Sequence, residues 1–313
     1  MIKEEFYFDS RDGENRIHAV RYTPDDGNVR GIVQIVHGMA EYVERYENLA
    51  EFLTKRGILV TGEDHLGHGK SVSEGGTFGY FCEQDPATVV VRDVHRLKKI
   101  TEEQYPQVPY IILGHSMGSF IARNYLCRYG SGIGGAVIVG TGMQPAGLIF
   151  ASKAMAGIQK LFCGSKHVSH FIDKAAFGGY NKRIDSPRTS SDWLSRNTEN
   201  VDRYIADELC GFTFTVNGFQ TLFELIRRLQ KQENLEKVPQ NLPILMVSGA
   251  EDPVGDYGKG VHKACDSLKR AGVKNITVKL YENDRHELLN EDDAETAMED
   301  IWQWICKEIP GIA

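Results

Sequence analysis

Short apolar runs alternate with longer amphipathic stretches along most of this sequence. Runs rich in Val, Ile and Leu, mostly without polar alternation, are typical of strands buried on both faces of a parallel sheet. The stretches between them have helical patterns, as expected of helices that cover such a sheet. We therefore predict a mostly parallel central sheet flanked by helices, with strands near Gly31–Val36, Ile58–Gly62, Tyr110–Gly114, Gly135–Gly140, Pro243–Gly249 and Ile276–Tyr281.

The first residues follow a different pattern. Phe6–Phe8 and Ile17–Tyr22 are strand-like segments on either side of Asp12-Gly13. Asp-Gly between two such segments is a signal for a tight turn that joins antiparallel strands. The sheet is therefore expected to begin with an antiparallel hairpin.

A long insertion separates two of the predicted strands. Between Gly140 and Pro243 lies more chain than one crossover helix needs. We predict that residues 143–229 form a mainly helical cap, inserted into a core made of residues 1–142 and 230–313. Most of the aromatic residues in the insertion are expected to form its own core, and the rest one apolar wall of a pocket. These aromatics are Phe150, Phe162, Phe171, Phe177, Tyr180, Trp193, Phe212, Phe214, Phe219 and Phe223.

The segment Gly114–Gly118 has the most informative chemistry. It reads Gly-His-Ser-Met-Gly, follows the apolar run Val108–Leu113 and precedes the helix-like stretch Ser119–Tyr129. A serine between glycines at a strand-to-helix turn is typical of a nucleophile elbow. The glycines leave room for the strained turn, and the helix N-terminus stabilises an oxyanion. Ser116 is therefore the candidate nucleophile.

The partners of such a serine are an acid and then a base, each in a loop after a strand. Asp252 follows the strand-like Pro243–Gly249, and His286 follows Ile276–Tyr281. We expect Asp252 to be the acid and His286 the base.

Two other residues compete for these roles. Glu251 could be the acid, but Pro253 fixes the turn directly after Asp252 and so favours Asp252. His262 lies in the charged, helix-like stretch Lys259–Arg270 and is expected to be an exposed helical residue rather than a base.

An oxyanion formed at the serine needs two backbone N–H donors. The strand Gly31–Val36 ends in His37, Gly38 and Met39, where the loop after an early strand donates one of them in folds of this type. Met117, the residue after the candidate nucleophile, donates the other. We therefore predict an oxyanion hole made by the N–H groups of Met39 and Met117, with a plain turn after the strand as the alternative.

Several segments together resemble the monoacylglycerol lipase and lysophospholipase group of the α/β-hydrolase superfamily, which is similar to the serine aminopeptidase S33 enzymes. Two residues depart from that pattern: Ala40 stands where relatives often have Gly, and Tyr42 where His is common. Both lie at the rim of the predicted site, so they bear on substrate choice more than on chemistry. The segments that carry the resemblance are His37–Glu41 with Arg45-Tyr46, Asp64–Ser71, Gly114–Gly118, Asp252-Pro253 and Arg285–Glu287.

The resemblance implies an α/β-hydrolase fold and a serine carboxylic-ester hydrolase that works through an acyl-enzyme. It assigns Ser116 as nucleophile, Asp252 as orienting acid, His286 as base, and Met39 with Met117 as the oxyanion hole. The implied substrates are small acyl esters such as monoacylglycerols or lysophospholipids, and no cofactor is implied. Transient contact of the cap with a membrane or micelle would suit such substrates.

Other functions remain open at this point. A short-chain or aryl (feruloyl-type) carboxylesterase or an S33-like aminopeptidase would use the same residues. A dehalogenase-like reaction would normally need Asp at the elbow, where this chain has Ser116. A non-catalytic ligand-binding protein on the same scaffold is a further alternative, since fold does not fix function. The sequence specifies neither the acyl length, the alcohol group nor the oligomeric state.

Composition narrows the class of protein and its partners. The chain has 313 residues, 41% of them hydrophobic, with a net charge of -7. This acidity argues against nucleic acid or a strongly anionic membrane as the main partner. The acidic first residues and the lack of a long apolar run predict neither a signal peptide nor a membrane span. Six scattered cysteines suggest reduced thiols, so we expect a cytoplasmic protein.

Asp64, His65 and His68 form a cluster of possible metal ligands. Carboxylate and imidazole groups can bind zinc, but no fourth ligand stands near them, and the interleaved Gly67 and Gly69 indicate a tight loop. We predict no metal here and expect this loop to support the floor beside the oxyanion loop.

Overall fold

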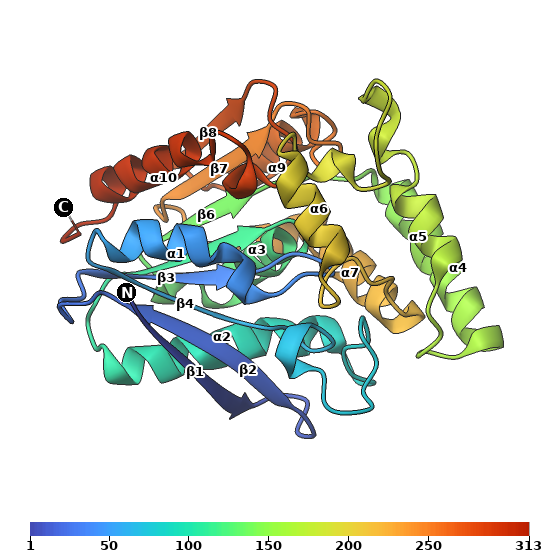
Figure 1. Cartoon of the computed structure of the whole chain (residues 1–313), viewed down its shortest axis with the longest axis horizontal. Helices are drawn as coiled ribbons and strands as arrows, with labels where there is room; N and C mark the ends of the chain where they lie inside the picture. The colour runs from blue at the N-terminus through green and yellow to red at the C-terminus, as the bar shows by residue number, and fades with distance from the viewer. Residues whose placement is uncertain (313) are drawn as a thin grey trace.

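One eight-stranded sheet forms the centre of the computed structural model, which describes residues 1–312 (Figure 1). Its strand order is β1-β2-β4-β3-β5-β6-β7-β8. Strands β3 to β7 are buried along their whole length, which explains why they appear in the sequence as nearly continuous apolar runs. The strands are β1 (Ile2–Asp9), β2 (Arg16–Thr23), β3 (Gly31–Val36), β4 (Ile58–Glu63), β5 (Tyr110–His115), β6 (Gly135–Val139), β7 (Ile244–Gly249) and β8 (Ile276–Tyr281).

The pairing confirms the mostly parallel sheet and its antiparallel start. Strand β1 pairs with β2 and β2 pairs with β4 in antiparallel register, whereas every pair from β4 to β8 is parallel. Parallel strands all end at one edge of the sheet, and the loops that follow them meet there. Residues far apart in the sequence can therefore share one site at this edge.

Helices cover both faces of the sheet. Apolar residues of α1 and α10 pack on one face, and those of α2, α3 and α9 pack on the other. This layering follows from strands that are apolar on both sides, each of which must be shielded from water. The helices are α1 (Glu47–Thr54), α2 (Pro86–Gln104), α3 (Met117–Tyr129), α4 (Ala146–Cys163), α5 (His170–Phe177), α6 (Thr198–Ala206), α7 (Val216–Leu229), α8 (Gln232–Leu235), α9 (Lys259–Arg270) and α10 (Ala294–Glu308).

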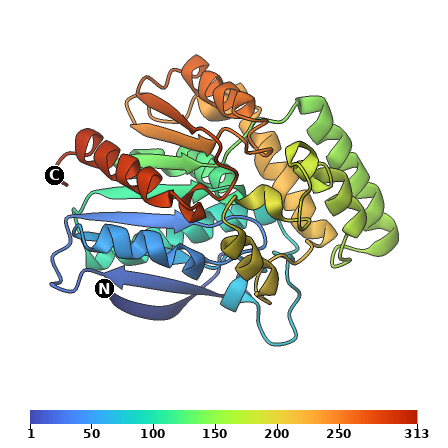
Figure 2. The same ribbon diagram turned by 45° about the horizontal axis from the view of Figure 1, so that its top comes forward.

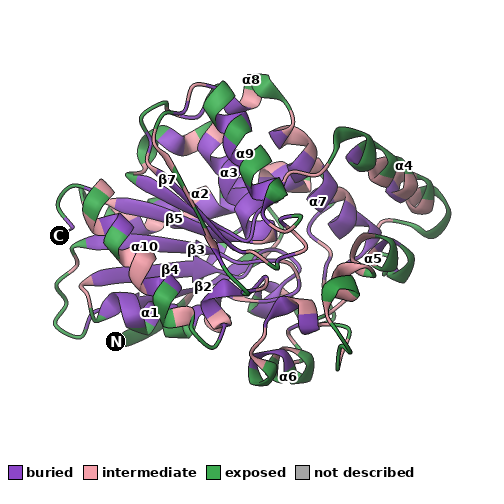
Figure 3. Ribbon diagram, turned by 90° about the horizontal axis from the view of Figure 1, so that it is seen from above, coloured by how far each residue is buried: buried purple, intermediate pink, exposed green. Residues whose placement is uncertain are grey.

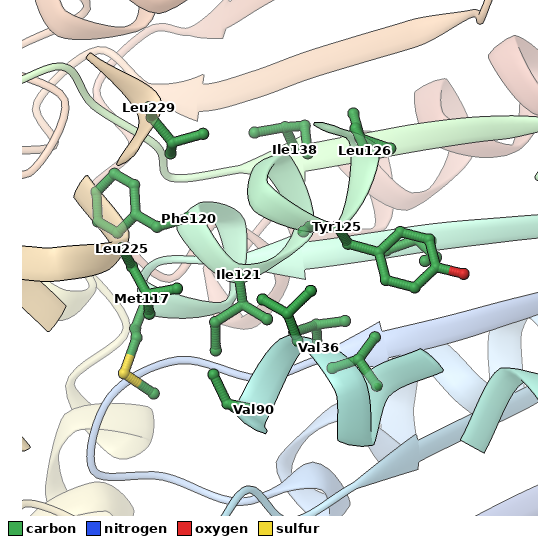
Figure 4. Packing of buried hydrophobic residues seen from close by; sticks show 14 of the residues in the cluster. Val36, Val90, Met117, Phe120, Ile121, Tyr125, Leu126, Ile138, Leu225 and Leu229 are labelled. Carbon is green, nitrogen blue, oxygen red and sulfur yellow. The ribbon is translucent and has the colours of Figure 1, made fainter. Parts of the chain in front are cut away.

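Helix α3, which follows the elbow, is enclosed by apolar side chains (Figure 4). Ile121 lies between Val36 of the sheet and Val90 of α2, while Phe120 lies beside Leu225 of α7. All five are buried. This close packing fixes the position of the helix N-terminus, which is where an anionic intermediate would form.

The long connection between β6 and β7 holds α4 to α8. Helices α4, α5 and α6 lie beyond the ends of the parallel strands (Figures 1 and 2). Helix α7 is buried along much of its length and packs against both α3 and α4, whereas α4 and α5 bury few residues (Figure 3).

Of the ten aromatic residues predicted to serve the cap, three are buried, three are exposed, and Phe177, Tyr180, Trp193 and Phe212 are half-buried. Phe214, Phe219 and Phe223 are buried, as expected of an internal core. By contrast, Phe150, Phe162 and Phe171 are 77%, 85% and 65% exposed, so they contribute nothing to such a core. No helix formed by residues 1–312 combines the length and the apolar character needed to cross a bilayer.

Candidate active site

Ser116 occupies the sharp turn between β5 and α3. Its backbone has φ 54° and ψ −122°, a conformation that costs a non-glycine residue about 1–3 kcal/mol. Three hydrogen bonds hold the turn: the Ser116 N–H donates to the Val139 carbonyl (3.0 Å), and the Ser116 carbonyl accepts from the N–H and the hydroxyl of Ser119 (2.9 and 2.6 Å). The surrounding structure therefore maintains a strained serine at the carboxyl end of the sheet.

Two glycines make room for this turn. A Cβ atom on Gly118 would collide with the carbonyl oxygen of Val36, so α3 can approach β3 only with glycine at this position. A Cβ atom on Gly38 would lie 3.1 Å from the Cβ of Ser116. The loop that contains Gly38 and Met39 therefore lies directly against the serine.

Met117 is the first residue of α3, so its N–H has no acceptor within the helix. This free N–H directly follows Ser116 in the chain. Met39 belongs to the loop that lies against Ser116. The arrangement places both predicted oxyanion donors in segments that border Ser116.

Asp252 and His286 form a buried hydrogen-bonded pair. His286 Nδ1 lies 3.0 Å from Asp252 Oδ2, and both side chains are almost completely excluded from solvent. The carboxylate also accepts from the Ser248 hydroxyl (3.2 Å) and the Val254 N–H (2.8 Å). Because a carboxylate oxygen only accepts, Nδ1 is the donor of this hydrogen bond, and Nε2 is the ring nitrogen that remains available to act as a base.

The competing residues lie elsewhere. The side chain of Glu251 is exposed. Only its backbone N–H contacts the loop of the base, where it donates to the Asp284 carbonyl. His262 is an exposed residue of α9. The structure therefore brings Asp252, and not Glu251, against His286.

The ring of His286 is enclosed by residues from three segments. The ring of His115, which precedes Ser116, lies 4.7 Å away between centroids, and His115 Nε2 donates to the His286 carbonyl at 3.1 Å. The ring of Trp193, from the connection between β6 and β7, lies 5.1 Å away between centroids and is tilted by 40°. A Cβ atom on Gly140 would lie 3.2 Å from the imidazole. Through His115, the base candidate is joined to the turn that carries Ser116.

A buried charged cluster beside these residues has no counterpart in the predicted site. Glu41 Oε1 accepts from the Gly38 N–H (2.5 Å) and the Tyr46 hydroxyl (2.8 Å), and His115 Nδ1 lies 3.3 Å from it. Arg45 joins the other Glu41 oxygen at 3.0 Å and binds both oxygens of Glu287. The cluster therefore ties the Gly38 loop to the His286 loop.

Electrostatics at this cluster favour ionised groups. Burial alone would lower the pKa of His115, but the adjacent Glu41 carboxylate outweighs burial and the pKa is raised. In the same way, burial opposes ionisation of Glu41, yet His115 and Arg45 hold its pKa low. In the sequence, Glu41, Arg45 and Glu287 contributed only to the resemblance. Their one local signal was that Glu287 follows the base candidate.

The Asp64–Ser71 loop lies beside the Gly38 loop, as predicted. The His65 N–H donates to His37 Nε2 at 3.0 Å, and the two rings stack at 4.0 Å. Asp64 is occupied by His18 and by backbone N–H groups. Within residues 1–312, no group of three or more His, Cys, Asp or Glu side chains is placed to hold a metal ion.

Comparison with known proteins identifies one family of hydrolases. The profile of the family described as serine aminopeptidase, S33, matches residues 27–293. The chain is 28% identical to a monoglyceride lipase from Rattus norvegicus, over 92% of this chain and 86% of that protein. It is also 28% identical to a monoacylglycerol lipase from Mycolicibacterium smegmatis, over 92% of each.

Solved structures confirm the α/β-hydrolase fold. A thermostable carboxyl esterase from Bacillus coagulans, in complex with glycerol, superposes with a TM-score of 0.92 at 31% identity over the whole of both chains. A soluble variant of a monoglyceride lipase from Saccharomyces cerevisiae, in complex with a substrate analog, gives a TM-score of 0.77 at 20% identity, covering 99% of this chain and 96% of that one.

Proposed function

Because the chain belongs to the serine aminopeptidase S33 family and is a serine carboxylic-ester hydrolase of the α/β-hydrolase fold, we propose that Ser116, His286 and Asp252 are its catalytic triad. The observation that carries this proposal is the buried His286–Asp252 pair, joined through His115 to the strained turn that presents Ser116. A nucleophile, a base and an acid that orients the base are the parts that acyl transfer requires.

The proposed reaction has two steps. His286 Nε2 takes the proton of Ser116 as the hydroxyl oxygen attacks the ester carbonyl, and the N–H groups of Met39 and Met117 stabilise the oxyanion. Protonated His286 then gives its proton to the leaving alcohol, and water hydrolyses the acyl-enzyme by the same route. Asp252 holds the Nδ1–H tautomer and stabilises the imidazolium. No step draws on a cofactor.

We propose further that residues 143–229 act as a cap over this site. The Trp193 ring packs against His286 in a tilted arrangement, and Tyr180 packs edge-on against Trp193 at 4.8 Å. Leu194 accepts the Glu287 N–H through its carbonyl at 2.6 Å. An aromatic wall beside the base suits an acyl chain, and we propose monoacylglycerols or lysophospholipids as substrates. The names of the similar lipases support this choice.

Helix α4 supports transient contact with a membrane or micelle. Its exposed positions carry only apolar or small side chains, including Leu161 and Phe162 at 83% and 85% exposure. Its lysines are paired instead with acids of other segments, Lys153 with Glu224 and Lys160 with Glu83. A helix with its apolar side outward is adapted to an apolar surface, and for a lipase-like enzyme we propose that this surface is lipid.

A series of glycerol and p-nitrophenyl esters of increasing acyl length tests the substrate class. We expect kcat/KM to rise with each methylene buried against the cap, by up to about fourfold for about 0.8 kcal/mol, until the pocket is full. Monoacylglycerols should also outperform acetates, feruloyl esters and triacylglycerols.

A short-chain carboxylesterase is the second candidate. The carboxyl esterase from Bacillus coagulans matches the whole chain at the higher identity of 31%, which favours it. Highest activity on acetate, falling with every longer chain, would select this function and contradict the lipase assignment.

A further inference from the structure

One helix of the proposed cap reaches the loop that carries His286. Asn200 of α6 is buried, and its amide Nδ2 donates to Glu287 Oε2 at 2.6 Å. Its Oδ1 accepts from Arg45 Nη2 at 3.2 Å. Since Glu287 directly follows His286, a side chain of α6 holds the chain next to the proposed base.

The charges around Asn200 explain why a neutral amide stands there. Arg45 binds the two oxygens of Glu287 at 2.6 and 2.7 Å and also binds Glu41 at 3.0 Å. One buried cation thus already serves two carboxylates. The Asn200 amide supplies a donor to Glu287 and an acceptor to Arg45 without adding charge, which a buried cluster tolerates best.

Further contacts belong to the same junction. The ring of Tyr204, also on α6, lies 4.9 Å from the Arg45 guanidinium. The Gly211 N–H donates to the carbonyl of Ala40, in the loop that contains Met39, at 3.0 Å. Helix α6 therefore contacts the loop of the base, and the residues that follow α6 contact the loop of the proposed oxyanion donor.

We propose that Asn200 is a positioning residue, which sets the place of His286 by holding Glu287 against Arg45. The inference rests on the proposed role of His286 as base. It makes α6 part of the scaffold of the active site rather than only a cover over it. Small displacements of a base relative to its nucleophile cost roughly 10²-fold in rate, so a side chain that touches no reacting atom can still affect kcat.

A charge exchange between the two contacting positions tests this inference. Asn200→Asp places a second carboxylate against Glu287, and we expect kcat for a water-soluble p-nitrophenyl ester to fall roughly ten- to hundredfold, with KM little changed. The double variant Asn200→Asp/Glu287→Gln restores one amide and one carboxylate beside Arg45, so it should recover most of the lost kcat. Glu199→Gln, on the exposed side of α6, is the matched control and should behave as the unaltered protein.

Recovery in the double variant cannot arise from a general loss of folding, because a second substitution in a damaged protein would add to the damage. A double variant no more active than Asn200→Asp, or a loss confined to KM, would overturn the positioning role. Asn200→Ala gives an independent reading, since a wild-type kcat in this variant would overturn it as well. An error in the proposed triad would give a different result from an error in the role of Asn200. In that case the Ser116→Ala variant would still be labelled by a fluorophosphonate.

Discussion

At the scale of single residues, the site depends on a serine that adopts a conformation its neighbours impose. The positive φ of Ser116 is stabilised by hydrogen bonds to Val139 and Ser119, and glycine at position 118 permits the close approach of α3 to β3. Strain of this kind persists only where the surrounding structure maintains it, and it is concentrated at functional positions. The same hydrogen bonds and packing hold Ser116 at the strand end before any substrate binds.

The acid residue gives the sharpest prediction at this scale. Asp252→Asn should lower kcat by roughly 10⁴-fold, because an amide at this position no longer enforces the Nδ1–H tautomer of His286 or stabilises its cation. The fold should remain intact, since the side-chain oxygen can still accept from the Val254 N–H. Steady-state kinetics on a soluble ester would measure the loss.

Glu251→Gln is the matched control. It also removes one negative charge, but from the exposed side chain that directly precedes Asp252. We expect a change of less than about twofold, since surface substitutions away from a site have small effects. Ser116→Ala should lose both hydrolysis and fluorophosphonate labelling and so sets the inactive reference. If Glu251→Gln proved more damaging than Asp252→Asn, the acid would have been assigned to the wrong carboxylate.

The positions of Ser116, Asp252 and His286 were predictable from sequence because each follows a recognisable strand. Loops after parallel strands meet at one edge whatever their separation in the chain. The cluster around Arg45 was not predictable in the same way. Arg45 and Glu287 are 242 positions apart, and Arg45 and Asn200 are 155 apart. Charged residues at such separations show no pattern that distinguishes a buried pair from two solvated side chains.

At the scale of elements, the parallel strands were predicted most closely. β3 and β8 have the expected bounds, and β4, β5, β6 and β7 differ by a single residue at one end. Where an apolar run ends in Gly or a turn, the end of the buried strand can be predicted to within about one residue. The N-terminal hairpin was predicted in kind but not in extent, because β1 runs from Ile2 to Asp9 where only Phe6–Phe8 was expected, and six residues join it to β2.

The orientation of α4 was beyond prediction from sequence. Its apolar residues have helical spacing, a pattern that normally indicates a face packed on the core. In the structure Phe150, Leu161 and Phe162 point outward, while Lys153 and Lys160 reach ion-pair partners on other segments. Those partners lie in distant parts of the chain. The helix also buries the apolar residues Ile149 and Ala156, so its sequence alone does not show which of its apolar sides faces outward.

The exposed apolar side of α4 yields a prediction about lipid binding. Leu161→Ser/Phe162→Ser should weaken binding to phosphatidylcholine vesicles by at least about tenfold, since each large apolar side chain contributes about 1.5–3 kcal/mol when fully removed from water. Co-sedimentation with vesicles would measure it. Hydrolysis of a soluble short ester should be unchanged, because neither side chain touches the residues of the site.

Ile2→Ser is the control for this experiment. Ile2 is also an exposed apolar side chain, at 57%, but it lies on β1. Its removal should leave vesicle binding unchanged. Equal losses in the two proteins, or none in either, would contradict the assignment of α4 as the lipid-facing helix.

At the scale of the whole molecule, net charge describes the average surface and not every face. The chain carries a net charge of -7, yet residues 104–172 contain no Asp or Glu. Because Lys153 and Lys160 in this stretch are paired with Glu224 and Glu83, the outer face of α4 is apolar rather than cationic. The global acidity and an apolar contact with lipid are therefore compatible, and such a contact needs no anionic headgroup.

Stability against pH is a property of the whole molecule that one buried carboxyl should affect strongly. Burial, reinforced by the neighbouring Glu63, raises the pKa of Asp93 to about 8 in the folded protein. In an unfolded chain the pKa of an aspartate is about 3.9. Between these values the folded protein retains a proton that the unfolded chain has lost. Stability must therefore fall as pH rises, by up to about 1.4 kcal/mol per pH unit from this group. The buried Asp93 carboxyl accepts hydrogen bonds from the Ser10 hydroxyl at 2.7 Å and from the Arg11 N–H at 2.6 Å.

Asp93→Asn tests this dependence, because the amide has the size of the protonated carboxyl and stays neutral at every pH. Its oxygen can still accept the Arg11 N–H. We expect the variant to lose less unfolding free energy than the unaltered protein between pH 5 and pH 8, as measured by urea unfolding at each pH. Asp9→Asn removes an exposed acid from the neighbouring strand and should leave the pH dependence unchanged. Parallel curves for Asp93→Asn and the unaltered protein would mean that Asp93 ionises with an ordinary pKa in the folded state.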